Sequence, residues 1–414
     1  MKEPDNSTIK NINVINDNPV MPPQPQPSNN GILLPMVMVG ILLVTSAVLI
    51  PVVLSRGKDS KKINFISTNN TDSASDTPIT PEKIDKYIDL HIHLDGAITL
   101  DIAKKLAKIQ NITLPTNNDT ELEKLLSVPD DCKSLDEFLK CFDFPSSLMQ
   151  TKEGLSESVR LVADNIQSQG VIYAELRYAP QNHKLKGMTQ EESIQAALDG
   201  LKKTSLKANL ILCFMRGDGN EAENEETLEL AKKYLTKDGG VVGLDLAGAE
   251  GLYPTSKYKD LFGKAKEYGI PFTIHAGEAA GADSVKDALD FGAVRIVHGE
   301  RSGEDKDVIN TLKNKGIALE MSPTSSRLTH AIEDMTKYPF MEYLHNGIKV
   351  TLGTDDMGIE RTTIAKEFEY MEKNYGLTYE EKKTLLLNSV DAAFTTDEVK
   401  KDLRNKLGFW KRLY

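Results

Sequence analysis

Short apolar runs alternate with amphipathic segments along the chain from about residue 81 onward. The first run, residues 88–95 (Ile-Asp-Leu-His-Ile-His-Leu-Asp), alternates apolar and polar residues with a period of two, which predicts a half-buried β-strand. Later runs of β-branched and aliphatic residues end near glycines or carboxylates and precede helix-like segments. The strands predicted in this way are Ile88–His93, Val171–Tyr178, Leu210–Met215, Val241–Gly248, Pro271–Glu278, Arg295–Gly299, Ile317–Ser322 and Lys349–Asp356.

Amphipathic spacing predicts helices between the first two strands, at Thr99–Gln110, Ser134–Leu148 and Glu157–Gln169. Alternation of strand and helix favours a parallel sheet, and eight such strands favour an α/β fold of the (β/α)8 TIM-barrel type with helical insertions. An open doubly wound sheet is the alternative. In a (β/α)8 barrel the functional side chains gather at the C-terminal ends of the strands, so polar residues at those ends are the candidates for a site.

The chain before residue 81 has a different composition. Residues 1–30 are rich in Asn, Pro and Gln, which predicts a disordered tail. Residues 31–54 hold no charge and are mostly Leu, Val, Ile and Met; at about 1.5 Å per residue, a helix of this length crosses the roughly 30 Å hydrocarbon layer. We therefore predict a single N-terminal transmembrane helix, with a cleaved signal peptide as the alternative. Residues 55–80 are predicted to link it to a globular domain at 81–414.

Two signals about membrane orientation oppose each other. Arg56, Lys58, Lys61 and Lys62 follow the apolar run, and the positive-inside rule would place the globular domain in the cytoplasm. Three Asn-x-Thr tripeptides, at residues 69–71, 111–113 and 118–120, match the glycosylation pattern of the opposite side. We expect a single-pass membrane protein and leave the side of its globular domain open.

Composition restricts the partners and the type of metal site. The net charge is −11, and without a local basic patch in the globular part this argues against nucleic-acid binding. Cys132, Cys141 and Cys213 are widely spaced and include no Cys-x-x-Cys, so they indicate neither a disulfide framework nor a thiolate zinc site. Any metal would have nitrogen and oxygen ligands, and no obligate protein partner is inferred.

Histidines are scarce, with seven in the chain, yet several stand at the ends of predicted strands. His91 and His93 would point to the same face of the first strand, whereas an isolated His-x-His is equally typical of a buried core pair. His275 also ends a predicted strand, and Asp355 lies in the last one. A shared metal centre gives these four residues a common role, and a set rich in imidazole with one carboxylate suits zinc with room for water.

Three further polar residues lie near these ligands in the sequence. Glu278 lies three residues after His275, in the turn that follows the predicted strand. A partly desolvated carboxyl group there can stay protonated and donate to a substrate. His298 is a candidate for orienting an attacking water and accepting its proton. Asp356 would reach a substrate if a turn begins there. The competing interpretation of Glu278 and Asp356 is that each is a carboxylate outside the reaction.

Six short motifs, taken together and in order, resemble the adenosine deaminase family. They are His91–Ala97 (His-Ile-His-Leu-Asp-Gly-Ala), Leu244–Gly248 (Leu-Asp-Leu-Ala-Gly), His275–Glu278 (His-Ala-Gly-Glu), Val297–Gly299 (Val-His-Gly), Ser322–Ser325 (Ser-Pro-Thr-Ser) and Thr354–Asp356 (Thr-Asp-Asp). The resemblance covers residues 85–395 and implies a (β/α)8 barrel that hydrolyses the purine 6-amino group and releases ammonia. The family often has Gly-His-Gly and Asn-Thr-Asp-Asp-Pro where this chain has Val297-His-Gly and Gly353-Thr-Asp-Asp-Met, which leaves the substrate preference open.

The resemblance also implies a role for individual residues. Its metal ligands correspond to His91, His93, His275 and Asp355, with one Zn²⁺ per chain. Glu278 corresponds to the residue that protonates purine N1, His298 to the one that handles the attacking water, and Asp356 to a contact with substrate and hydroxide. Gly248 corresponds to a backbone N–H that meets purine N3, and Asp95 to the residue that binds the ribose 5′-hydroxyl. The pocket-flanking apolar helix corresponds to Leu135, Phe138, Leu139 and Phe142, whose spacing equally fits an ordinary buried helix face.

The expected function is zinc-dependent hydrolytic deamination of adenosine and 2′-deoxyadenosine to inosine and 2′-deoxyinosine. Asp95 favours a nucleoside, because related adenine deaminases resemble His-x-His-Leu-Glu-Gly at this point, with a longer acid. Adenine, N6-methyl-AMP and methylthioadenosine are the alternative 6-aminopurine substrates. A membrane-tethered binding protein that has lost catalysis is a further alternative, opposed by the complete set of matched ligands and acids.

Overall fold

The computed structural model describes residues 83–409, except residue 130, residues 133–134 and the side chains of residues 135–137. Its strands all run parallel to their neighbours. They are β1 (Tyr87–His93), β2 (Val171–Tyr178), β3 (Ala208–Met215), β4 (Val241–Ala247), β5 (His275–Ala276), β6 (Arg295–His298), β7 (Ala318–Met321) and β8 (Lys349–Leu352).

The strands pair in sequence order as two four-stranded sheets, β1 to β4 and β5 to β8, that meet at both edges. At one edge the Asp355 N–H donates to the His91 carbonyl at 2.8 Å, and the His93 N–H donates to the Asp355 carbonyl at 3.0 Å. At the other edge the Leu244 N–H donates to the Pro271 carbonyl at 3.1 Å, and the Thr273 N–H donates to the Leu244 carbonyl at 3.0 Å. The ring is therefore closed, as predicted for a (β/α)8 barrel and not for an open sheet.

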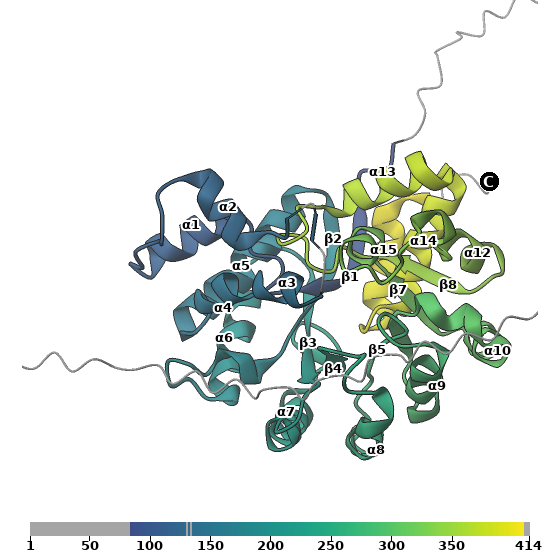
Figure 1. The fold of residues 1–414 in the computed structure, drawn as a ribbon, viewed down its shortest axis with the longest axis horizontal. Coiled ribbons are helices and arrows are strands. Elements are labelled where there is room, and N and C mark those ends of the chain that lie inside the picture. The colour runs from purple at the N-terminus through teal and green to yellow at the C-terminus, as the bar shows by residue number, and fades with distance from the viewer. Residues whose placement is uncertain (1–82, 130, 133–134, 410–414) are drawn as a thin grey trace, which may run out of the picture. The chain divides into compact units, whose positions relative to one another are not determined.

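Helices cover the outside of the strands, which gather in the middle of the molecule with α6 to α10 around them (Figure 1). Five helices precede β2, and α1 and α2 pack against each other there. The α-helices up to β5 are α1 (Leu100–Ile109), α2 (Asp119–Leu126), α3 (Leu135–Lys140), α4 (Asp143–Ser147), α5 (Lys152–Ser168), α6 (Gln190–Leu201), α7 (Glu221–Tyr234) and α8 (Lys259–Glu267). Those after β5 are α9 (Ala282–Phe291), α10 (Lys306–Lys315), α11 (Pro323–Leu328), α12 (Phe340–His345), α13 (Ile364–Tyr375), α14 (Tyr379–Ala392) and α15 (Asp397–Leu407). Short 3₁₀ turns are η1 (Pro180–His183), η2 (Thr255–Tyr258), η3 (Glu300–Glu304) and η4 (Met335–Lys337).

The helix boundaries follow local capping chemistry. Thr189 and Thr378 each begin a helix with a reciprocal capping box, in which the threonine hydroxyl and a glutamate three residues later satisfy exposed backbone N–H groups. Gly292 and Gly316 end α9 and α10 in the left-handed conformation, which a residue without a Cβ adopts at little cost. These connections deliver the chain to the next strand with few intervening residues.

Four predicted elements differ clearly from the structure. The last strand, expected at Lys349–Asp356, ends at Leu352, and the helix expected at Glu157–Gln169 begins at Lys152. The single helix expected at Ser134–Leu148 is divided into α3 and α4 around Cys141 and Phe142. Pro145 has no N–H to donate to the Cys141 carbonyl, so one continuous helix is disfavoured. The strand expected at Pro271–Glu278 is reduced to β5, with an isolated bridge at Phe272 before it. Gly277 ends β5 by turning the chain with a φ of 81°.

The centre of the barrel is charged. Arg177 contacts Asp245 at 2.9 Å and Glu320 at 2.5 Å, and Arg295 contacts Glu320 at 2.6 Å and Glu175 at 2.7 Å. All five side chains are at most 1% exposed. Alternate residues of β2 supply Glu175 and Arg177, so one face of that strand carries both signs of charge. Below the C-terminal strand ends, the barrel is therefore held by a buried ion-pair ladder.

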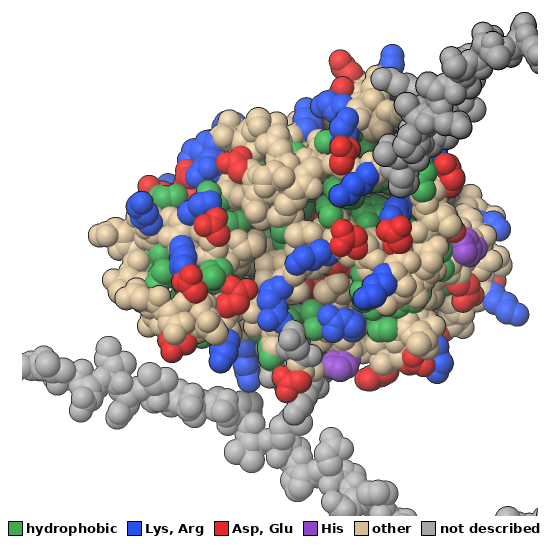
Figure 2. Space-filling view, turned by 90° about the horizontal axis from the view of Figure 1, so that it is seen from above, with side chains coloured by type: hydrophobic (Ala, Val, Ile, Leu, Met, Phe, Trp, Pro, Cys, Tyr) green, Lys and Arg blue, Asp and Glu red, His purple; other side chains and the backbone are tan. Residues whose placement is uncertain are grey.

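The outer surface seen in Figure 2 carries acidic and basic side chains interspersed with one another. Lys105 and Asp101, for example, form an exposed ion pair at 2.6 Å along α1. Among the helices of residues 83–409 that the structure describes, none has the length and apolar character needed to span a bilayer. The tail predicted at 1–30, the span at 31–54 and the linker at 55–80 lie outside the described residues.

Candidate metal centre and active site

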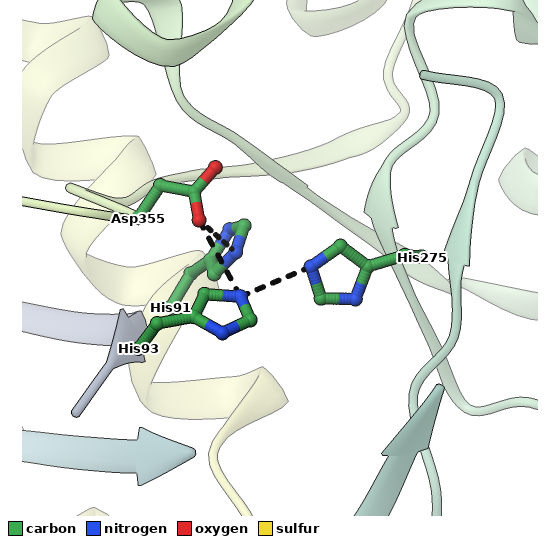
Figure 3. A group of neighbouring side chains, drawn as sticks. All are labelled: His91, His93, His275 and Asp355. Atoms are coloured by element: carbon green, nitrogen blue, oxygen red, sulfur yellow. Dashed lines mark hydrogen bonds and ion pairs between the residues drawn. The ribbon is translucent and has the colours of Figure 1, made fainter. Parts of the chain in front are cut away.

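Three imidazoles and one carboxylate converge at the C-terminal end of the barrel (Figure 3). His91 and His93 lie on β1, His275 begins β5, and Asp355 follows β8. The Asp355 Oδ1 atom lies 3.0 Å from His91 Nε2 and 3.5 Å from His93 Nε2, and His93 Nε2 lies 3.1 Å from His275 Nε2. The four possible ligand atoms all lie within 4.8 Å of one another. The structure therefore brings together the four residues that the sequence analysis grouped as ligands.

Buried partners fix the orientation of these rings. Asp245 faces His275 Nδ1 at 2.9 Å, and a carboxylate there assigns the ring proton to Nδ1. The Nε2 atom of His275 then carries a free electron pair and no proton, and it points toward His93 and Asp355 (Figure 3). Ser322 Oγ lies 3.4 Å from His91 Nδ1 on the opposite side of that ring from Asp355. The converging atoms are thus electron-rich, and a shared cation would satisfy them.

The electrostatics of the cluster fit a divalent metal. Burial lowers the pKa of His91 to about 3 and that of His93 well below its ordinary value, so both rings are neutral at physiological pH. Burial alone would raise the pKa of Asp355, but the neighbouring imidazoles of His91 and His298 hold it well below the usual range. Neutral imidazole and ionised carboxylate are the forms that bind metal, and this donor set matches that of nitrogen- and oxygen-ligated zinc.

Glu278 and His298 stand together beside the cluster. Glu278 Oε2 lies 3.5 Å from His298 Nε2, which is 3.7 Å from Asp355 Oδ2. Burial raises the pKa of Glu278, which favours its protonated form. Burial opposes the charged form of His298, but the carboxylates of Glu278 and Glu300 outweigh it and raise the pKa of the imidazole well above its usual value. The site therefore holds a weakened acid beside a strengthened base.

Asp356 and Glu360 add two buried carboxyl groups to the same end of the barrel. Both side chains are 5% exposed. Burial, followed by the charge of Asp355, raises the pKa of each well above its ordinary value. Asp356 Oδ1 has no hydrogen-bond partner among the described residues. This oxygen atom is buried against Gly96, and its hydrogen-bonding capacity is unused in the structure.

A cavity of about 310 Å³ opens directly onto this cluster. Its walls include His93, Glu278, His298, Asp355, Asp356 and Gly248. A neighbouring cavity of about 840 Å³ shares His93 and Gly248 with the first and includes Asp95. Burial raises the pKa of Asp95 to about 6. Asp95 therefore lines the cavity next to the one that opens onto the cluster, and not that cavity itself.

The apolar helix predicted to flank the pocket lies beside both cavities. Leu139 and Phe142 line the two cavities, and Phe138 lines the smaller one. Phe138 is 3% exposed and packs with Val128 and Ile359, so it also belongs to a small core cluster. The side chain of Leu135 lies outside the part of the chain that the structure describes.

The sequence analysis assigned no role to several buried residues that hold the site. Asp245 contacts His275 directly, and Arg177 pairs with both Asp245 and Glu320. Glu250 accepts hydrogen bonds from the loop that carries Glu278. A charge within an apolar strand, such as Asp245 in Leu-Asp-Leu, is the signal that could have revealed the first group, because an unpaired charge is costly to bury. No local pattern marks Glu250.

Comparisons with known proteins cover nearly all of the described part of the chain. The sequence profile of the adenosine deaminase family matches residues 87–410. The adenosine deaminase of Haemophilus ducreyi is 47% identical over 322 residues, which cover 76% of this chain and 94% of that protein. An adenosine deaminase of Clostridium botulinum is 41% identical over 322 residues, covering 77% of this chain and 96% of that protein.

Solved structures extend the likeness to the fold. An adenine deaminase from Arthrobacter aurescens has a TM-score of 0.70 and 26% identity, covering 79% of this chain and 99% of its own. The N6-methyl-AMP deaminase of Arabidopsis thaliana has a TM-score of 0.67 and 26% identity, covering 80% of this chain and 98% of its own. From the length of the profile match and the identity to curated relatives, this chain belongs to the adenosine deaminase family.

Proposed function

We infer that this protein catalyses the hydrolytic deamination of adenosine and 2′-deoxyadenosine, yielding inosine or 2′-deoxyinosine and ammonia. The observation that carries this inference is the meeting of the His91–His93–His275–Asp355 cluster with Glu278 and His298 on one cavity. Metal-ligating, acidic and basic groups together serve a hydrolysis in which a ring is protonated while water attacks it. Family membership places that chemistry on a 6-aminopurine.

We propose that His91, His93, His275 and Asp355 hold one Zn²⁺. When bound there, the metal lowers the pKa of a coordinated water from 15.7 towards about 7 and so supplies a nucleophile at neutral pH. Glu278 donates a proton to purine N1, which makes C6 electrophilic. His298, whose protonated form a bound cation would disfavour, would accept the proton of the water that attacks C6, and Asp356 would orient that water. Transfer of a proton from the resulting C6 hydroxyl group to the amino group would then let the C6–N bond break, so that ammonia leaves and C6 becomes a carbonyl carbon.

The two cavities suggest how a nucleoside would lie. The purine would occupy the cavity beside the cluster, with the Gly248 N–H directed to N3 and Leu139 and Phe142 against the ring. The ribose would extend towards Asp95 in the neighbouring cavity. A carboxyl group can accept a hydrogen bond from the ribose 5′-hydroxyl but would repel a 5′-phosphate. This arrangement favours a nucleoside over a nucleotide.

The test follows the loss of adenosine absorbance with the purified protein before and after treatment with a chelator, and again after Zn²⁺ is restored. We expect turnover that disappears with the metal and returns with it. Adenine is the second candidate substrate because the chain shares its fold with an adenine deaminase. A strong preference for adenine or N6-methyl-AMP would reverse the substrate assignment. Bound metal without turnover of any 6-aminopurine would favour a binding protein instead.

The role of Asp95 has its own test. Asp95→Ala should reduce kcat/KM for adenosine by roughly tenfold, the value of one charge-assisted hydrogen bond. It should leave kcat/KM for 5′-deoxyadenosine nearly unchanged, because that substrate lacks the hydroxyl group. Asp143, which lines the same cavity, provides the matched control as Asp143→Ala. An equal loss on both substrates would reject a specific contact with the 5′-hydroxyl.

We also propose, from the apolar run at residues 31–54 alone, that the protein is attached to a membrane by its N-terminal segment. The full chain should sediment with membranes and resist extraction by alkaline carbonate, whereas a chain that begins at residue 81 should stay in the supernatant. Protease protection in sealed vesicles would then identify the side on which the globular domain lies. If alkaline carbonate released the full chain from the membranes, the proposed transmembrane segment would be rejected.

A further inference from the structure

The loop that carries Glu278 is wrapped around a single buried carboxylate. Glu250, in the connection after β4, is 2% exposed. Its Oε2 atom accepts the backbone N–H groups of Glu278 at 3.0 Å, Ala279 at 2.7 Å and Ala280 at 3.0 Å. Its Oε1 atom accepts the N–H of Gly277 at 2.7 Å. Four consecutive backbone donors of one loop therefore point at one side chain.

The N–H groups of the loop depend on Glu250, although the Gly277 carbonyl also accepts the Arg301 N–H at 3.2 Å. The strand before it, β5, is only two residues long, and Gly277 leaves that strand in the left-handed region. Buried N–H groups without a partner are costly, and hydrogen bonds to a charged acceptor are stronger than those to a neutral one. The Glu250 carboxylate thus satisfies the loop's donors and fixes the path of its backbone.

A buried hydrogen-bond chain ties Glu250 to the neighbouring elements. The Ser284 hydroxyl, in α9, donates to Glu250 Oε1 at 2.5 Å and lies 2.7 Å from Thr255 Oγ1. Arg216 donates to Thr255 Oγ1 at 3.0 Å and to the His275 carbonyl at 2.6 Å. These hydrogen bonds therefore hold the segment from His275 to Ala280 at both of its ends.

Every hydrogen bond that Glu250 accepts from the described residues comes from this loop or from Ser284. With five donors on two oxygen atoms, the carboxylate is not available as an acid or base. Glu250 nevertheless borders the same cavity as Glu278 and His298. Its influence on the reaction would have to pass through the position of Glu278.

We propose that Glu250 is the positioning residue of the general acid: it clamps the Gly277–Ala280 backbone so that the Glu278 carboxyl group is presented to the ring it protonates. This proposal rests on the proposed function, because it concerns the acid of that reaction. A clamp of this kind affects the protonation step while leaving the metal ligands and the fold in place. Glu250 acts by holding the backbone of the loop, and it does not supply a charge to the cavity.

Glu250→Gln is the direct test, since the amide keeps the shape but can present only one acceptor oxygen. Amide hydrogen exchange of residues 277–280 should become faster in the metal-free protein, independently of activity. In the metal-loaded enzyme, kcat for adenosine should fall by about tenfold or more, the scale expected when a reacting group is displaced by about 1 Å. KM should change less than kcat, and the metal content should stay close to that of the wild type. The melting temperature should fall, because the amide leaves buried N–H groups of the loop without an acceptor.

A double-variant cycle separates positioning from general structural support. If Glu250 acts through Glu278, kcat of Glu250→Gln/Glu278→Gln should equal that of Glu278→Gln alone. A multiplicative loss in the double variant would reject the proposal, as would unchanged exchange at residues 277–280 or a kcat within threefold of wild type. The control is Glu304→Gln, which removes a carboxylate that accepts only the Ala282 N–H just beyond the loop and should leave turnover unchanged.

A second variant keeps the test decisive if Glu250→Gln does not fold. Ser284→Ala removes one donor to Glu250 without touching the loop, and it should lower kcat to a smaller extent and again without effect in the Glu278→Gln background. A multiplicative loss in that background, or no loss of kcat at all, would then overturn the proposal. If the wild-type enzyme itself does not deaminate adenosine, the proposed function fails first, and the exchange measurement still reports whether the clamp exists.

Discussion

Replacing Arg177 with methionine should destabilise the protein severely, because this one guanidinium group serves two buried carboxylates. Arg177 pairs with Asp245 and Glu320 and also donates to the Leu90 carbonyl at 2.7 Å. Methionine has a similar length but cannot donate a hydrogen bond. The variant would leave Asp245 with His275, the Leu246 N–H and the Cys213 thiol, none of which carries the fixed positive charge of a guanidinium group. Glu320 would keep Arg295 and Thr273.

The size of the effect follows from burial. The ladder opposes three carboxylates to two guanidinium groups, so losing Arg177 increases an excess of negative charge in a region without water contact. Breaking a buried ion pair by removing one partner costs about 3 to 5 kcal/mol, and two carboxylates place this variant near the upper end. The total free energy of unfolding of a domain is about 5 to 15 kcal/mol, so the loss is a large share of it.

Arg160 provides a matched control because it also pairs with two carboxylates. It contacts Glu157 at 2.7 Å and Asp164 at 2.9 Å, but its side chain is 27% exposed. Water compensates for the lost pairs at such a position, so Arg160→Met should cost less than about 1 kcal/mol. The number of ion pairs is the same in the two variants, and the depth of burial is what differs.

The assay is urea denaturation of the metal-free protein, followed by far-UV circular dichroism. Arg177→Met should lower the free energy of unfolding by roughly 5 kcal/mol, and Arg160→Met by less than 1 kcal/mol. Because Asp245 orients His275, Arg177→Met should also weaken metal binding by about tenfold. A loss below about 1 kcal/mol for Arg177→Met, or equal losses for both variants, would refute the reasoning from burial.

Further outcomes follow from the site. His275→Ala should lose both bound metal and turnover, measured by atomic absorption and by adenosine absorbance; retained turnover would reject the ligand set. Since burial raises the pKa of Glu278 and the protonated form donates, activity should be present below that raised pKa and decline as pH rises through it; a pH–rate profile with no such limb would exclude this acid. Gly96→Ala should lower kcat strongly, because its Cβ would lie 1.8 Å from Asp356 Oδ1 and displace that carboxylate. Normal kinetics in Gly96→Ala would argue against a role for Asp356.

The sequence by itself predicted most of the strand pattern and grouped the four candidate metal ligands. Residues 88–93 alternate apolar and polar groups, and a strand repeats every two residues, so His91 and His93 had to share a face. Parallel strands place their C-terminal ends at one edge of the barrel, which brings His275 and Asp355 to the same place without further information. Local periodicity and one rule of topology were enough for this part of the site.

Only the tertiary structure decided what holds those ligands in position. Arg177 and Glu320 are separated by 143 residues, and their pairing depends on how strands β2 and β7 face each other across the barrel. Glu250 meets the backbone of residues 277–280, and backbone donors leave no mark in a sequence. The physical reason is that periodicity reports which face a side chain occupies, whereas its partner on that face depends on the path of distant segments.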